Sequence, residues 1–390
     1  MEYLLVFIPL IITAIVVVSG FYFGRIDKGF PVPVLFIPSF LILLIITAMS
    51  QIMRHDNFTD VEYRSYYYTK IRHTDRWDEY IHRTCTREVP DGTDSEGRTK
   101  YKTETYDCSY VETHPERWIL YDNVGNDYYC DEEDFNKVKN LWKVPSVFVD
   151  MHRNYYSIDG DAQDYYWDNN RGTIVTFTEE HTYENRLLGS GSAYNFMDIG
   201  KDEAKKLGLY EYPEIKGKYL FKEQNPILGY KIGPGNLKRY LAFNALEGKT
   251  RQMHLFVLVF PDSCGVRIAQ EQQAYWKGGN KNEFIICIGL NKKTGIIAWA
   301  YTFSWQYDTT LDVKCRQWLT GNGKHIFDPG KLMTWIENNK GLWKRREFKE
   351  FEYIDSYLTK SQMTTIIWTV CILSIISGII LIMLIWTPKN

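Results

Sequence analysis

The residues best placed to do chemistry lie in one stretch near the middle of the chain, FVDMHRNYYSIDGDAQDYYWDNN, residues 148–170. It combines carboxylates with an imidazole, which suits either a divalent metal or an acid/base pair. The candidate metal ligands are Asp150, His152, Asp159, Asp161 and Asp164. An EF-hand calcium loop beginning at Asp159 fails, because Asp164 replaces its glycine and Asn170 replaces its bidentate glutamate. A looser calcium site on the same carboxylates stays open, as does a purely structural role for His152.

The same stretch is rich in aromatic residues, which suit a recognition surface. Tyrosine and tryptophan give a large contact area at low entropic cost and are enriched at interfaces. The predicted binding surface consists of Tyr155, Tyr156, Tyr165, Tyr166 and Trp167. The alternative is that these tyrosines only fill the faces of a β-sheet. We expect a recognition surface here in preference to a catalytic centre.

Motifs of the common enzyme classes are missing from the sequence. GSGSAYN (residues 189–195) lacks the third glycine of a dinucleotide site, and GYKIGPGN (residues 229–236) lacks the Gly-Lys-Ser/Thr of a P-loop. Cys108 and His114 form a pair found in thiol enzymes, but a disulfide through Cys108 would remove the nucleophile. The net charge of −2 gives no reason to expect a nucleic-acid partner. The sequence therefore favours binding over catalysis.

Three long runs without charge predict membrane spans. They cover residues 3–23, 29–53 and 361–388, and about 20 apolar residues suffice to cross a bilayer core. The first run does not resemble a cleaved signal peptide, because Glu2 stands where basic residues are expected. We expect a membrane protein with three transmembrane α-helices, an N-terminal hairpin in residues 1–53 and one C-terminal helix in residues 364–386. The lipid bilayer is then one partner of the chain.

Charges beside these spans predict their orientation. The short turn between the first two spans carries Arg25 and Lys28 against Asp27. Positive charge on short loops marks the cytoplasmic side, which places the large domain outside the cytoplasm. Basic residues at positions 344–349, before the last span, point the other way, but long domains translocate largely regardless of charge.

Cysteine usage supports the same placement. Six of the seven cysteines lie between the second and third spans, and an even number outside the cytoplasm fits disulfides. Cys85 and Cys108 are the predicted pair, because a hairpin through the turn-rich PDGTDSEGRT (residues 90–99) would bring them opposite each other. Cys287, within FIICIGL, has the alternative role of a small buried apolar residue.

Between the spans we expect a large soluble domain with a β-rich first part and an α+β second part. Residues 54–145 are rich in Tyr, Thr and Val with alternating polarity, which is typical of strands. Residues 146–345 mix helical and strand-like patterns, which predicts an α+β arrangement. A juxtamembrane segment, residues 346–363, leads into the last span.

Several elements can be placed from capping residues and periodicity. Residues 131–142 predict a short helix with an acidic first turn. Asn236 and Gly248 are expected to cap and to terminate a second helix, and Asp328 is expected to cap a third. The unbroken apolar run at 255–260 predicts a strand that is covered on both faces.

Five strings in the sequence resemble a known family. They are YDCSYVETHPERW, FVDMHRNYYSIDG, YYWD, QAYWKGGNKNEF and FSW. They are similar to uncharacterised membrane-anchored proteins of large tailed bacteriophages and related bacterial genomes, over most of residues 60–350. The resemblance implies a phage or bacterial origin and a role at the host envelope. It brings no established activity and no catalytic residues.

The expected function is that of a membrane-anchored extracytoplasmic binding protein whose partner is another protein or an envelope polymer. The alternative is an envelope hydrolase that uses the Asp/His cluster, with a divalent metal as its candidate cofactor. For the binding protein no cofactor is expected.

Overall fold

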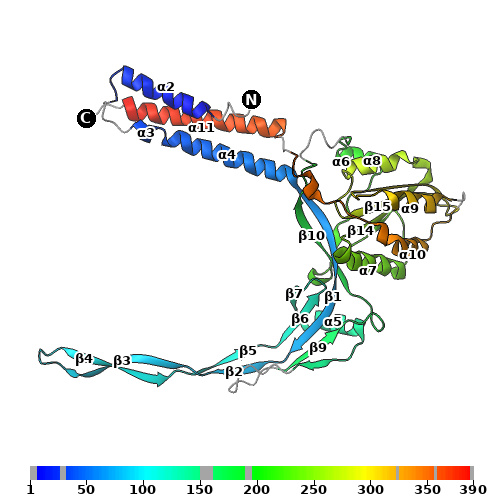
Figure 1. Cartoon of the computed structure of the whole chain (residues 1–390), viewed down its shortest axis with the longest axis horizontal. Coiled ribbons are helices and arrows are strands. Elements are labelled where there is room, and N and C mark those ends of the chain that lie inside the picture. Colours follow the sequence, from blue (N-terminus) through cyan, green and yellow to red (C-terminus); the bar gives the residue numbers. More distant parts are fainter. Residues whose placement is uncertain are drawn as a thin grey trace. The chain divides into compact units, whose positions relative to one another are not determined.

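The computed structural model describes residues 7–26, 32–149, 161–188, 196–321, 325–354 and 358–386. The chain forms two compact units (Figure 1). The first comprises residues 1–62, 182–198 and 347–390, and the second comprises residues 63–181 and 199–346. The first unit holds the apolar helices from the two ends of the chain, and the second holds most of the strands.

The apolar runs of the first unit form α2 (Ile8–Tyr22), α3 (Val32–Leu35), α4 (Ile37–Phe58) and α11 (Lys360–Trp386). Two stretches, Pro33–Phe58 and Lys360–Ile385, are long and apolar enough to cross a membrane. Helix α2 has 15 residues. A helix needs about 20 residues to cross a bilayer core, so α2 is shorter than that. Two of the three predicted runs therefore contain helices of sufficient length and apolarity to span a membrane, and the crossing itself stays a prediction for all three.

Small side chains let these helices approach one another closely. A Cβ atom at Gly378 of α11 would lie 3.4 Å from a methyl carbon of Ile12 in α2. The hydroxyl of Thr13 in α2 hydrogen-bonds that of Ser39 in α4, and Ser39 donates to the carbonyl of Pro9 at 3.2 Å. Large apolar side chains also face outward, among them Ile15, Leu44 and Leu384. Helices that are apolar on all sides suit a hydrocarbon environment better than water.

The first sheet, most of whose residues belong to the second unit, is built from β1 (Thr59–Thr74), β6 (Arg117–Asp122), β7 (Asp127–Cys130), β8 (Val147–Val149), β9 (Ala162–Tyr166) and β10 (Thr176–Glu184). Its order is β7-β6-β1-β9-β8, and β10 also pairs with β1. Helix α5 (Glu132–Trp142) packs Phe135, Val138 and Trp142 into the core of this sheet. The helix predicted at 131–142 is confirmed, with Asp131 accepting the Asp134 amide at 2.8 Å.

A two-stranded ribbon continues the ladder of β1 and β6. Its strands are β2 (Trp77–Ile81), β3 (Thr84–Thr93), β4 (Thr99–Asp107) and β5 (Tyr110–His114). Because β2 pairs with β5 and β3 with β4, residues 77–114 form one nested hairpin, the β-arm (Figure 1). Ile81 pairs with Tyr110 and Thr84 pairs with Asp107, so the register continues unchanged across the break between the two ribbons.

The second sheet has the order β13-β14-β15-β16, and only the last pairing is antiparallel. Its strands are β13 (Ile227–Leu228), β14 (His254–Pro261), β15 (Glu283–Leu290) and β16 (Ile297–Ser304). Every residue of β15 is buried, as is every residue of β14 except Pro261. The predicted strand covered on both faces is therefore confirmed.

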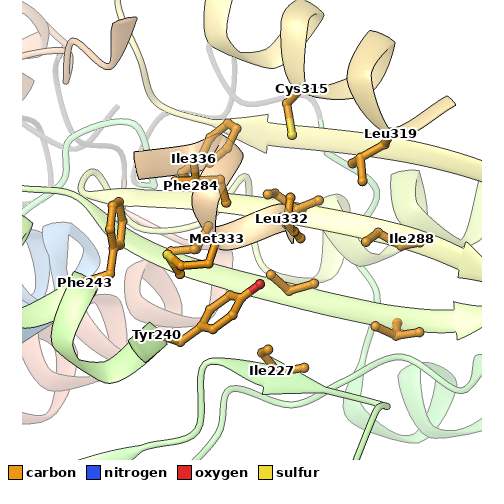
Figure 2. Packing of buried hydrophobic residues seen from close by; sticks show 14 of the residues in the cluster. Ile227, Tyr240, Phe243, Phe284, Ile288, Cys315, Leu319, Leu332, Met333 and Ile336 are labelled. Carbon is orange, nitrogen blue, oxygen red and sulfur yellow. The ribbon is translucent and has the colours of Figure 1, made fainter. Parts of the chain in front are cut away.

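Helices α7 (Pro234–Thr250), α9 (Thr310–Thr320) and α10 (Pro329–Asn339) pack against one face of this sheet. Figure 2 shows Tyr240, Cys315 and Met333 from these helices in the same cluster of buried side chains as Phe284 and Ile288 of the sheet. Helix α8 (Arg267–Tyr275) lies on the other side, where Trp276 meets Phe256 with ring centroids 5.8 Å apart. The other elements among the described residues are α6 (Lys201–Leu207), β11 (Ile215–Lys216), β12 (Glu223–Gln224) and the 3₁₀ turns Tyr219–Phe221, Asp262–Cys264, Lys340–Leu342 and Phe348–Phe351.

The predicted ends of α7 were wrong. The helix begins at Pro234, whose fixed φ suits the first helical position, and it runs through Gly248 to Thr250. Gly248 serves a close approach instead, because a Cβ atom there would lie 2.9 Å from the carbonyl oxygen of Ser65. The cap predicted at Asp328 is confirmed, since its side chain accepts two amides at the start of α10.

Candidate functional site

Much of the stretch singled out in the sequence lies outside the described residues. This applies to Asp150, His152, Tyr155, Tyr156 and Asp159. The metal site predicted on them stays a prediction, as does their share of the aromatic surface. Asp161 is described and exposed, and its carbonyl accepts the backbone amide of Asp75 at 3.1 Å.

Asp164 forms an ion pair with Arg72 inside the fold. It is fully buried on β9, and Arg72 on the neighbouring β1 donates to both of its oxygens, at 2.6 and 2.8 Å. The hydroxyl of Tyr166 donates to the same carboxylate at 3.1 Å. Burial by itself raises the pKa of Asp164, but the hydrogen bonds and charge of Arg72 outweigh it and hold that pKa below its usual value. The arrangement is that of a structural ion pair.

The described aromatic residues of this stretch have different environments. Tyr165 belongs to the core of the first sheet, where its ring meets Phe135 edge-on at 5.9 Å. Trp167 is half-buried against the same core and contacts Tyr67 edge-on at 5.3 Å. Only Tyr166 among these three is exposed. The alternative stated above, that these aromatic residues fill the faces of a sheet, therefore accounts for Tyr165 and for the buried part of Trp167.

The predicted disulfide between Cys85 and Cys108 is confirmed. Their Cα atoms lie 5.8 Å apart, and 23 residues of sequence separate them. The bond crosses the β-arm near the break between the β2–β5 pair and the β3–β4 pair. There the Cys108 amide donates to the carbonyl of Arg83 at 2.9 Å. The other five cysteines are free. Cys287 and Cys315 are fully buried, in keeping with the apolar role that the sequence left open for Cys287.

The β-arm buries little of its own surface. Large side chains are exposed along it, namely Tyr80, Tyr101, Tyr106, Tyr110 and Val111. Among the described residues, each arm strand pairs with one other arm strand only, so no further strand pairs with either edge of the ribbon. Open edges and exposed aromatics are the features by which a strand accepts a partner.

Two sets of metal-binding side chains occur where the first sheet leads into the β-arm. The first set is His73, Asp75 and Glu116, and the second set is Glu79, Glu112 and His114. In each set the three ligand atoms lie within 4.8 Å of one another.

Both sets have the same construction. In the first, His73 Nε2 lies 2.6 Å from Glu116 Oε1 and 3.7 Å from Asp75 Oδ1. Its ring stacks on Trp118 with centroids 5.6 Å apart. In the second, His114 Nε2 lies 2.9 Å from Glu79 Oε2. The ring of His114 stacks on Trp77 at 4.0 Å, and Glu112 stands directly opposite Glu79 in the ladder.

Sequence reasoning missed these sets, although a signal for them exists. Residues 73–79 read HTDRWDE and residues 112–118 read ETHPERW. Alternate positions of a strand share one face, so each segment presents a histidine, a tryptophan and two acids on the same side. The antiparallel register places each histidine opposite a tryptophan, as the pairs His73↔Trp118 and Trp77↔His114 show.

A cavity of about 510 Å³ lies beside the carboxyl ends of the parallel strands β14 and β15, a common place for a ligand. Lys231 and Lys292 line it together with Tyr210 and Tyr230. Among the described residues that line this cavity there is no carboxylate and no histidine. The cavity therefore does not provide the Asp/His pair of the hydrolase alternative.

Comparison of the chain with known protein families, with curated proteins and with solved structures found no match. What the protein binds is accordingly inferred from its own side chains.

Proposed function

We propose that the protein is a membrane-anchored extracytoplasmic binding protein whose β-arm contacts its partner. The observation that carries this proposal is the exposed arm itself. Residues 77–114 form an ordered hairpin with five large exposed aromatic or aliphatic side chains, yet no residue of the hairpin belongs to the hydrophobic clusters found among the described residues. A segment that stabilises so little of its own fold is best explained by contacts with another molecule.

Three observations support the membrane anchor and the placement of the arm outside the cytoplasm. Two helices are long and apolar enough to anchor the chain in a membrane. The arm contains a disulfide, and disulfides persist mainly in oxidising compartments. The positive charge of the short turn at Arg25 and Lys28 favours a cytoplasmic turn and an external domain. The resemblance to phage proteins adds a setting, the host envelope, in which such a protein would act.

The partner that this surface suits is a protein or an envelope polymer. An open strand edge can receive an extended peptide by main-chain hydrogen bonds. Exposed tyrosines add flat apolar contact area with a polar end. Both features occur on the same ribbon, so one partner can engage the edge and the side chains together.

Photo-crosslinking in intact cells tests this proposal. A crosslinking amino acid replaces Tyr101 or Tyr106, which lie on opposite faces of the β-arm, and Tyr219, which is exposed outside the arm, is the matched control. We expect an adduct of higher mass from the two arm positions and none from position 219. Protease treatment of the adduct distinguishes a protein partner from a polymer. Equal adducts at all three positions, or none at the arm, would contradict the proposal.

A further inference from the structure

We propose that the two His–carboxylate sets, His73/Asp75/Glu116 and Glu79/Glu112/His114, each bind one divalent transition-metal ion. This inference goes beyond the proposed function and does not rest on it, because it concerns the side chains alone and not the side of the membrane on which they lie.

In both sets the ligand atoms are spaced nearly as they would be around a bound metal ion. Ligands about 2.0–2.1 Å from a tetrahedral zinc ion lie about 3.3–3.4 Å from one another. The first set already has nitrogen–oxygen separations of 2.6 and 3.7 Å, and the second has one of 2.9 Å. Small side-chain rotations within the 4.8 Å limit therefore suffice to surround an ion.

The charges of the two sets call for a cation. Glu79 and Glu112 are direct cross-strand neighbours, and like charges in that position destabilise a ladder. Asp75 and Glu116 likewise converge on one imidazole. Among the described residues no lysine or arginine forms an ion pair with any of these four carboxylates, although ion pairs are numerous elsewhere on the ribbon, such as Arg87 with Glu104. A divalent ion would offset both repulsions.

Tryptophan packing holds each histidine in position. The rings of His73 and Trp118 are inclined by only 14°, as are those of His114 and Trp77. Stacking of this kind limits rotation of the imidazole while Nε2 faces the carboxylates. Groups that orient a metal ligand in advance strengthen binding, because less freedom is lost when the ion arrives.

The ligand types indicate the class of metal. Calcium and magnesium prefer sites made of oxygen ligands alone, whereas an imidazole with carboxylates suits zinc and similar first-row divalent ions. Three protein ligands leave one position of a tetrahedral ion open. That position can take water or a side chain of a bound partner.

Zinc binding to the full-length protein in detergent tests the inference. Equilibrium dialysis is carried out with magnesium and calcium in large excess, and the number of zinc ions bound per chain is compared between variants. We expect His73→Ala to lose one ion, His114→Ala to lose one ion, and the double variant to lose two. His82→Ala is the matched control, since His82 lies on the same ribbon outside both sets, and it should bind as many ions as the wild-type protein.

A second variant of each set guards against local unfolding. Glu116→Gln and Glu112→Gln keep the size of the side chain and remove one charged ligand, so each should also lose one ion while the Cys85–Cys108 disulfide stays formed. Zinc binding that is undiminished in the double histidine variant overturns the inference. Displacement of the zinc by the excess calcium overturns the assignment to transition metals.

Discussion

Replacing Arg72 with alanine is expected to lower the free energy of unfolding by about 3–5 kcal/mol, the usual cost of leaving a buried charge without its partner. Asp164 is fully buried, and Arg72 supplies two of its hydrogen bonds. A domain of this size loses about 2–4 °C of its melting temperature for each kcal/mol. Near-UV circular dichroism of the full-length protein in detergent should therefore show a melting temperature lower by about 10 °C.

The double variant Arg72→Met, Asp164→Leu is the control for this result. Replacing both members of a buried pair by apolar residues of similar volume usually costs far less than removing one. The pKa of Asp164 lies below its usual value, so its stabilising contribution is present above the ordinary carboxyl range and is lost as the pH falls through that lowered pKa. A single variant as stable as the wild-type protein would show that Asp164 is not buried as a charge.

Acidification below about pH 6.5, the ordinary pKa of histidine, is expected to destabilise the protein through His254. This residue is buried at the start of β14, and burial lowers its pKa to about 3. At a pH between the lowered pKa in the folded chain and the ordinary pKa in the unfolded chain, His254 is protonated only when the chain is unfolded. Stability therefore falls with decreasing pH, by up to about 1.4 kcal/mol per pH unit.

The variant His254→Gln isolates this effect. Glutamine stays neutral and can still accept from the amide of Asn244, whose nitrogen lies 3.3 Å from His254 Nε2. Denaturant unfolding between pH 7 and pH 4.5 should give a flatter dependence on pH for this variant than for the wild-type protein. His325→Gln, at an exposed position, should keep the wild-type slope. If the free energy of unfolding of His254→Gln depends on pH as steeply as that of the wild-type protein, the loss of stability at low pH does not come from His254.

Features that depend on local patterns were predictable from the sequence. The apolar run at 255–260 gave a strand buried on both faces, and Asp328 capped a helix as expected. The Cys85–Cys108 pair followed from one hairpin, because a single turn fixes which residues meet. Helix α9 was missed, although Leu311, Cys315 and Leu319 recur at the four-residue spacing of one helix face.

Features that depend on distant contacts were not predictable. Arg72 and Asp164 are separated by 92 residues, and only the pairing of β1 with β9 brings them together. Without that pairing, Asp164 could be taken for a free metal ligand. The two His–carboxylate sets likewise require the register of β1 with β6 and of β2 with β5. Before that register is known, each histidine has only the carboxylates of its own strand as neighbours.

The central claim is that the β-arm and the rest of the extramembrane chain lie outside the cytoplasm, and the free cysteines make a direct test available. Cys264 is exposed and free. Cys287 and Cys315 are buried, and burial together with Asp134 and Asp131 raises the pKa of Cys130 to about 12. Reaction of the extramembrane thiols with a maleimide is therefore expected at Cys264.

The decisive measurement is labelling of intact cells with a membrane-impermeant maleimide, with and without prior reduction. We expect Cys264 to be labelled without reductant, and Cys85 and Cys108 to be labelled only after reduction. The variant Cys264→Ser should lose the first signal and keep the second. Labelling of Cys264 only after the cells are lysed would place the domain inside and contradict the account.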